Sequence, residues 1–220
     1  MSKLIGLMGL KGSGKDTVAK KIIYVESGSW KKIAFADALK DAVASLFGWN
    51  RNLLEGDTSE SREWREKVDA YWARELNIKD FSPRKALQMI GTEVMRNHFN
   101  EDFWIKAVKR KILDSTNHIV ITDVRFPNEA NMIKSMGGQI VQVIRGELPE
   151  WWEAAAKFNK EEHLPTEENL GFTDKNGQLW SIHPSEYSLA GVIEPDYVIH
   201  NDGTLTDLQK SVLVMLNTLY

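Results

Sequence analysis

The stretch Gly9 to Thr17, GLKGSGKDT, has the residue types of a phosphate-binding loop. Its glycines let successive backbone N–H groups turn toward an anion, and Lys15 adds a positive charge. An apolar run precedes the stretch and a helical pattern follows it, which is the setting in which such a loop binds phosphate at a helix N-terminus. The alternative is a glycine-rich turn with an incidental lysine. We expect phosphate contacts from Gly9, Lys11, Gly12, Ser13, Gly14, Lys15, Asp16 and Thr17.

The hydroxyl of this loop comes one residue later than usual. A Ser or Thr directly after the lysine binds Mg²⁺ in many phosphate-binding loops, but here Asp16 follows the lysine and the hydroxyl is on Thr17. We therefore expect substrate phosphates and waters to hold Mg²⁺, with Asp16 and Thr17 acting indirectly through water. Asp16 is equally explained as a first-turn acid that favours the helix dipole. The late hydroxyl is similar to that of P-loop nucleoside monophosphate kinases of the adenylate kinase type.

A second candidate group lies in TDVRFPNEA. Asp123 and Arg125 directly follow a predicted strand, and ligands bind at the carboxyl ends of strands in open α/β sheets. An acid at this position can orient Mg²⁺ waters, and an arginine can hold a phosphate by two hydrogen bonds. The alternative for Asp123 is a plain strand end. We expect Asn128 to cap the next helix.

Three further stretches carry polar residues that could contact a substrate. Asn201, Asp202 and Gly203 form a turn after the last predicted strand, and this turn commonly lies beside the nucleotide base in P-loop kinases. Asp37 and Lys40 follow the second predicted strand. The stretch 82–108 places Arg84, Gln88 and Thr92 near one helical face, although a solvated helix face explains that pattern equally well.

Five β-rich runs separated by helical patterns predict the fold. Near-continuous apolar strands alternating with helices indicate a parallel sheet covered on both faces. Within the charged region 51–85, the apolar residues from Trp64 to Leu76 fall on one helical stripe, which indicates a helical subdomain. A polar stretch, 147–194, lies between the last two predicted strands and is expected to act as a lid. The predicted strands are Leu4 to Met8, Lys32 to Ala36, His118 to Thr122, Gln139 to Ile144 and Tyr197 to His200.

Composition and charge limit the ligands, metals and cellular locations that we expect for this chain. The 220 residues suit one α/β domain with insertions, and the net charge of −3 gives no reason to expect a nucleic-acid polymer as partner. No cysteine is present, and the five histidines lack metal-site spacing, so we expect no zinc site. No signal or membrane segment is recognisable at the N-terminus, so we expect a cytoplasmic protein, in the host cytoplasm if its origin is a phage.

Taken together, these stretches resemble the bacteriophage deoxynucleoside monophosphate kinase family. The matching pieces are GLKGSGKDT, FADALKDA, SPRKALQMIGTEVMRNHFNEDFWIKAV, TDVRFPNEA, IHPSEYSL and IHNDGTLTDL, in the family's order. The resemblance implies a single three-layer P-loop kinase domain over 1–220, with an acceptor-binding insertion at about 49–100 and a lid-like insertion at about 147–194. It also implies transfer of the ATP γ-phosphoryl group to a deoxynucleoside 5′-monophosphate with Mg²⁺.

The resemblance assigns roles to residues. Lys15, Arg125 and Asp123 are expected to be catalytic. The loop and Asn201, Asp202 and Gly203 would bind ATP. The lid has no arginine of its own, so Arg145, His183 and Glu186 are its candidates, with Lys157 or Lys160 as further sources of positive charge. The acceptor-binding candidates are Asp37, Lys40, Arg84, Gln88, Thr92, Arg96 and Trp104.

Two alternatives stay open at this point. One is a P-loop kinase for another small acceptor, such as dephospho-coenzyme A or phosphomevalonate. The other is a module that binds ATP without transferring phosphate, against which a second basic cluster argues. The accepted bases, the means of rejecting ribonucleotides and the existence of a homodimer are left open.

Overall fold

A computed structural model describes residues 2–161, 172–174, 176–180, 182 and 184–220. The chain divides into two compact units. The first comprises Met1–Ala34 and Ile112–Tyr220, and the second comprises Phe35–Lys111. The second unit is larger than the acceptor-binding insertion expected at 49–100.

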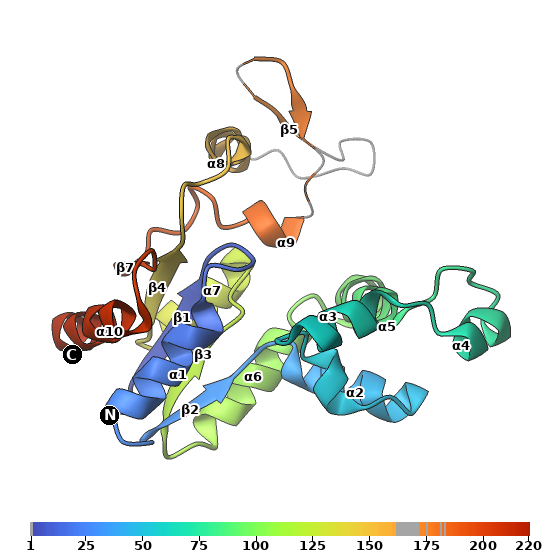
Figure 1. The fold of residues 1–220 in the computed structure, drawn as a ribbon, viewed down its shortest axis with the longest axis horizontal. Helices are drawn as coiled ribbons and strands as arrows, with labels where there is room; N and C mark the ends of the chain where they lie inside the picture. Colours follow the sequence, from blue (N-terminus) through green and yellow to red (C-terminus); the bar gives the residue numbers. More distant parts are fainter. Residues whose placement is uncertain (1, 162–171, 175, 181, 183) are drawn as a thin grey trace. The chain divides into compact units, whose positions relative to one another are not determined.

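The first unit is built on a five-stranded sheet (Figure 1). All its neighbouring strands pair in parallel, in the order β2-β3-β1-β4-β7, which confirms the predicted sheet. Every residue of the central β1 is buried, as expected for a strand with helices on both faces. The strands are β1 (Leu4–Met8), β2 (Trp30–Ile33), β3 (His118–Ile121), β4 (Gln139–Ile144) and β7 (Tyr197–His200).

Alternate residues of β1 contact helices on opposite faces of the sheet. Ile5 and Leu7 belong to the core formed with α1 (Lys15–Val25) and α10 (Leu205–Leu219). Gly6 faces the other way, where a side chain would meet Ile133 of α7 (Pro127–Ser135). Because successive strand residues point to opposite faces, these contacts define three layers, as predicted.

The first unit also contains the predicted lid region, between β4 and β7. It comprises α8 (Trp151–Lys160), a small antiparallel pair of β5 (Phe172–Thr173) with β6 (Leu179–Trp180), and α9 (Pro184–Tyr187). Ala155, Tyr187 and Ala190 form a small core there. No helix among the described residues is long and apolar enough to cross a membrane.

The second unit is helical. Val43, Leu54, Phe81 and Ala86 form its buried core, and the Phe47 and Trp49 rings stack beside it at 4.6 Å. Its elements are α2 (Asp37–Phe47), η1 (Arg51–Leu54), α3 (Ser59–Glu66), α4 (Ala70–Glu75), α5 (Pro83–Gln88), the π-helix η2 (Met89–Phe99) and most of α6 (Phe103–Leu113).

Two local predictions were wrong. The stripe from Trp64 to Leu76 is not one helix, because the Asp69 side chain accepts hydrogen bonds from the Tyr71 and Trp72 amides and begins a new helix. The second strand lies at Trp30–Ile33, two residues earlier than expected, because the residues after Ile33 lead into α2.

Candidate active site

The predicted phosphate-binding loop joins β1 to α1 in the first unit. Gly9, Gly12 and Gly14 have φ angles of 147°, 85° and 100°, which favour glycine strongly over residues with a side chain. A methyl group at Gly9 would overlap the carbonyl oxygen of Val143, and one at Gly14 would overlap the Asn201 amide. The glycines therefore serve both the turn and the close approach of neighbouring strands.

The first turn of α1 presents a set of unused hydrogen-bond donors. Gly14 is the N-cap and offers no side chain to cap the helix. Within the described part of the chain, the backbone N–H groups of Gly14, Lys15, Asp16 and Thr17 donate to nothing. The Ser13 hydroxyl is also buried without a partner there. Such a group of donors at a helix N-terminus suits a phosphate.

Lys15 turns back over the loop. Its Nζ donates to the carbonyl oxygens of Gly9 at 2.6 Å and Leu10 at 2.9 Å. Burial, followed by the positive charge of Arg125, lowers the pKa of Lys15 to about 8 from 10.5, although nearby carboxylates, Glu186 foremost, act in the opposite direction. This lysine is held in a site that favours loss of its charge, as expected where an anion normally supplies the compensating charge.

Arg125 has a fixed backbone and a half-exposed side chain. The Arg125 and Phe126 amides donate to Oε2 of the buried Glu129 at 2.8 and 3.1 Å. The Arg125 guanidinium donates to Glu186 Oε1 at 3.2 Å and to Ser185 Oγ at 3.4 Å. The structure thus brings together two residues that the sequence placed in separate motifs.

The start of α7 corrects one prediction. Asn128 is not its cap, because the helix begins one residue earlier, at Pro127. Asn128 instead accepts a hydrogen bond from the Glu129 amide at 3.0 Å. Glu129 takes the capping role, since its carboxylate reaches back to the amides before the helix.

The turn after β7 also reaches the loop. Asn201 Nδ2 donates to the Ser13 carbonyl oxygen at 2.9 Å, and Asp202 Oδ1 accepts from the Gly146 amide at 2.6 Å. Gly203 packs close to Asp207, at the start of α10. Of the three predicted turn residues, Asn201 is therefore the one that contacts the phosphate-binding loop.

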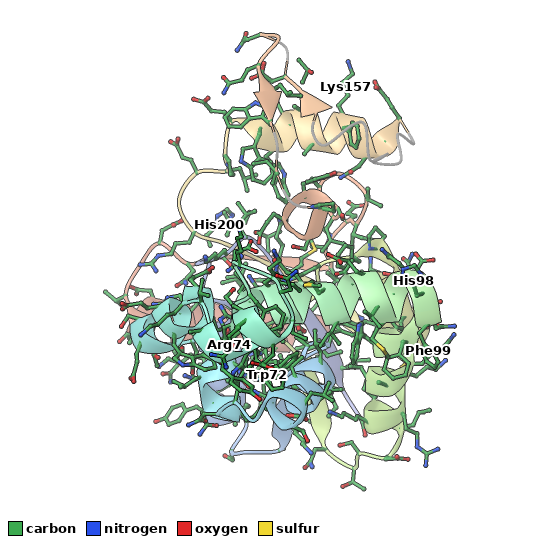
Figure 2. All side chains as sticks on the ribbon, turned by 90° about the vertical axis from the view of Figure 1, so that its right-hand side faces the viewer. Trp72, Arg74, His98, Phe99, Lys157 and His200 are labelled. Carbon is green, nitrogen blue, oxygen red and sulfur yellow. The ribbon has the colours of Figure 1, made fainter. Side chains whose placement is uncertain are left out.

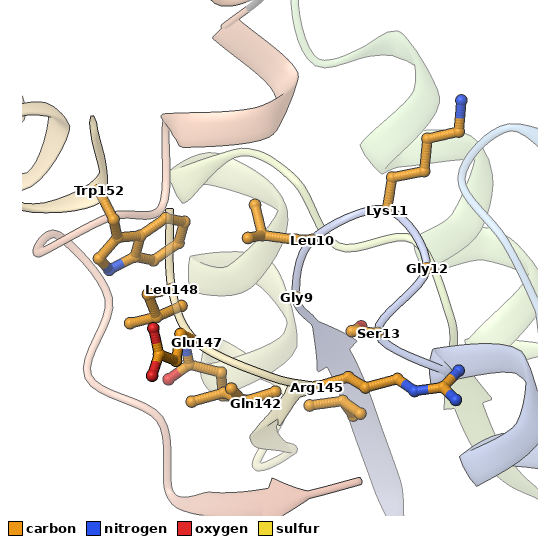
Figure 3. Close-up of a pocket in the computed structure, with 12 residues that line it drawn as sticks. Gly9, Leu10, Lys11, Gly12, Ser13, Gln142, Arg145, Glu147, Leu148 and Trp152 are labelled. Carbon is orange, nitrogen blue, oxygen red and sulfur yellow. The ribbon is translucent and has the colours of Figure 1, made fainter. Parts of the chain in front are cut away.

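A pocket of about 160 Å³ lies between the loop and the end of β4 (Figure 3). Loop residues Gly9 to Ser13 line one side, and residues 142–145, 147 and 148 together with Trp152 line the other. The Arg145 side chain runs along this pocket beneath the loop, while Lys11 points away from it (Figure 3). Trp152 also lines a smaller pocket that contains Arg125 and Glu186.

The candidates for indirect metal binding are less enclosed. Asp16 forms an exposed ion pair with Lys32 at 2.9 Å, and Thr17 is half-buried on the first turn of α1. Asp123 is half-buried and close enough to raise the pKa of Lys15. Among the described residues, no group of three or more His, Asp or Glu side chains is placed to hold a metal ion.

Comparison with known proteins decides the family. The deoxynucleotide monophosphate kinase family matches residues 54–181. A putative deoxynucleotide monophosphate kinase of Acanthamoeba polyphaga mimivirus is 33% identical, covering 96% of this chain and 94% of its own. The chain belongs to the deoxynucleotide monophosphate kinase family. Deoxynucleoside-5′-monophosphate kinase of Escherichia phage T5 is 28% identical (67% of this chain, 80% of its own), and deoxynucleotide monophosphate kinase of Enterobacteria phage T4 is 25% identical (65% and 81%).

The acceptor-binding residues expected from this kinase family lie in the second unit, where several already have partners. Lys40 pairs with Glu55 at 2.7 Å, Arg84 pairs with Glu66 at 2.8 Å, and Asp37 lies 3.5 Å from Arg51. Gln88 and Thr92 are exposed and Arg96 is half-buried. Trp104 is buried, and its indole N–H donates to the Gly91 carbonyl at 2.9 Å, so packing explains it.

The structure places the lid candidates of this family member differently from one another. Glu186 contacts Arg125 and Arg145 lines the loop pocket, whereas His183 lies outside the described residues. Lys157 stands out from α8 into solvent (Figure 2). Sequence reasoning missed three residues that contact candidate site residues or line the pockets: Arg51, which pairs with Asp37, Glu129, which anchors the Arg125 amide, and Trp152, which lines both pockets. A tryptophan in an otherwise polar insertion was the one available indication for Trp152.

Proposed function

We propose that this chain transfers the γ-phosphoryl group of MgATP to the phosphate of a deoxynucleoside 5′-monophosphate, giving ADP and a deoxynucleoside diphosphate. The observation that carries the proposal is the convergence of Lys15, Arg125 and the unused N–H groups of α1 on one loop, in a member of this kinase family. Donors and cations without a nucleophilic side chain suit phosphoryl transfer, which depends on positioning and electrostatics.

Each group has a distinct part in the transfer. The amides of residues 14–17 and Lys15 bind the β- and γ-phosphates of ATP. An oxygen of the acceptor phosphate attacks the γ-phosphorus, the bond to the β-phosphate oxygen breaks, and ADP leaves. Arg125 stabilises the negative charge that develops on the transferred group. No covalent intermediate with the protein is formed.

The metal is part of the substrate in this proposal. Mg²⁺ arrives with ATP and neutralises phosphate charge. In this proposal Asp16, Thr17 and Asp123 contact its waters, and Asp16 and Thr17 share the first turn of α1. The acceptor monophosphate is proposed to meet Lys40, Arg84 and Arg96 of the second unit, where Lys40 and Arg84 must leave Glu55 and Glu66.

The test is a coupled ADP assay with ATP and a panel of acceptors. We expect deoxynucleoside monophosphates to be phosphorylated, with ribonucleotides and dephospho-coenzyme A turned over far more slowly. The matched control is Lys15→Met, which should fold normally. It should bind ATP weakly and show almost no turnover. Activity on dephospho-coenzyme A alone would favour the other kinase class. ATP binding in calorimetry with no ADP from any acceptor would favour a non-catalytic module.

A further inference from the structure

The Ser13–Gly14 peptide is held from outside the loop. Asn201 Nδ2 donates to the Ser13 carbonyl oxygen at 2.9 Å, across a separation of 188 residues. This contact leaves no space for a side chain at Gly14, because a methyl group there would overlap the Asn201 amide. The end of β7 and the phosphate-binding loop are therefore joined at one peptide group.

The orientation of that peptide decides which of its two polar groups faces the loop's interior. A trans peptide is planar, so its C=O and N–H point in opposite directions. With the Ser13 oxygen directed to Asn201, the Gly14 N–H points away from Asn201. It donates to no other group in the part of the chain that the structure describes.

The peptides on either side are held locally, the following one by the first turn of α1, where the Val18 amide donates to the Gly14 carbonyl oxygen at 2.9 Å. Gly12 and Gly14 both have φ angles in the left-handed region, where glycine moves freely between conformations. The Ser13 amide donates to Leu10 O at 3.2 Å within the loop itself. A rotated Ser13–Gly14 peptide would turn a carbonyl oxygen toward the anion, which is repulsive.

We infer that Asn201 is a positioning residue that fixes the Ser13–Gly14 peptide so that the Gly14 N–H faces the phosphates of ATP. It acts on the triphosphate through the loop and not by touching the nucleotide base. The inference rests on the proposed function for its ligand. It differs from the expectation that the turn after β7 contacts the base.

Inorganic tripolyphosphate separates the two roles, because it has the phosphates of ATP without the base. We expect Asn201→Ala to weaken binding of tripolyphosphate and of ATP by the same factor, about tenfold, as for one lost hydrogen bond to a charged group. Calorimetry measures both dissociation constants. Asn201→Leu, which keeps the branched shape of the side chain without its donor, should give the same result and serves if the alanine variant unfolds.

The matched control is Asn159→Ala. Asn159 Nδ2 also donates to backbone carbonyls, of Tyr187 at 2.8 Å and Ala190 at 2.9 Å, but away from the loop. The Asn159→Ala variant should keep the tripolyphosphate affinity of the unmodified protein. Weakening of ATP but not tripolyphosphate binding by Asn201→Ala would overturn the inference in favour of a base contact, as would equal effects of the two alanine variants. If the unmodified protein bound neither ligand, the proposed function itself would fail.

Discussion

The Arg125 guanidinium donates a hydrogen bond to the Glu186 carboxylate at 3.2 Å, joining the start of α7 to the lid region. The same guanidinium is proposed to meet the transferred phosphoryl group. Phosphate and Glu186 are thus alternative anionic partners for one cation. The Arg125–Glu186 ion pair leads directly to the first two predictions.

Arg125→Ala should lower kcat by about 10³-fold or more, as for other arginines that stabilise charge in phosphoryl transfer. The melting temperature should stay within a few degrees, because a partly exposed ion pair contributes only about 0–1 kcal/mol. Arg125→Lys should recover part of the activity, since an ammonium cannot form the two-point contact of a guanidinium. Steady-state kinetics and thermal unfolding check this. A fully active alanine variant would remove Arg125 from the mechanism.

Glu186→Gln should lower KM for the substrate whose phosphate meets Arg125, by up to about fivefold, because a competing anion is removed. Glu161→Gln is the control, since Glu161 forms an exposed pair with Lys157 at 3.7 Å, away from Arg125. Titrations of each substrate with the other saturating provide the measurement. A raised KM would mean that Glu186 holds Arg125 in its working position instead.

The depressed pKa of Lys15 gives a prediction about stability and pH. This pKa is about 8 in the folded chain, against 10.5 for a lysine in water, so between these values the unfolded chain binds more protons. Stability due to Lys15 therefore rises with pH across that window. Denaturant unfolding of the unmodified protein and of Lys15→Met should show a difference that grows in favour of the unmodified protein from about pH 8 to pH 10.5. A flat difference would contradict the shifted pKa.

Trp152→Ala should raise ATP hydrolysis relative to phosphoryl transfer. Trp152 lines both the loop pocket and the pocket of Arg125, so its loss admits water to the transfer site. Trp151→Ala is the control, because Trp151 packs against the same small core without lining either pocket. Phosphate release without acceptor is compared with ADP formation in its presence. Equal ratios in both variants would assign Trp152 to packing.

Local sequence patterns were enough to predict the elements whose structure depends mainly on neighbouring residues. The loop and α1 follow from glycine spacing and helical periodicity, and the parallel strands other than β2 follow from apolar runs, so these were predicted closely. The break between α3 and α4 was missed because an apolar stripe continues through it, while the Asp69 side chain competes for the backbone amides.

The contacts that complete the site could not be read from the chain. The Asn201 to Ser13 bond spans 188 residues and the Arg125 to Glu186 pair spans 61, and neither stretch has a pattern that names its partner. The ion pairs of Lys40 and Arg84 also depend on tertiary placement. Sequence thus predicted which residues are suited to phosphate chemistry, whereas the structure shows which of them are occupied by protein carboxylates.

The buried carboxylate of Glu129 has a kinetic consequence. It anchors the Arg125 and Phe126 amides, so the main chain at Arg125 stays in place while its half-exposed side chain is able to turn. Exchange of the guanidinium between two anions then requires only rotation about side-chain bonds, which takes picoseconds to nanoseconds for exposed residues. Collective motions of the main chain take about microseconds to milliseconds. Exchange of Glu186 for the proposed phosphoryl group as the partner of Arg125 would therefore be complete long before the main chain moves, and would not limit turnover.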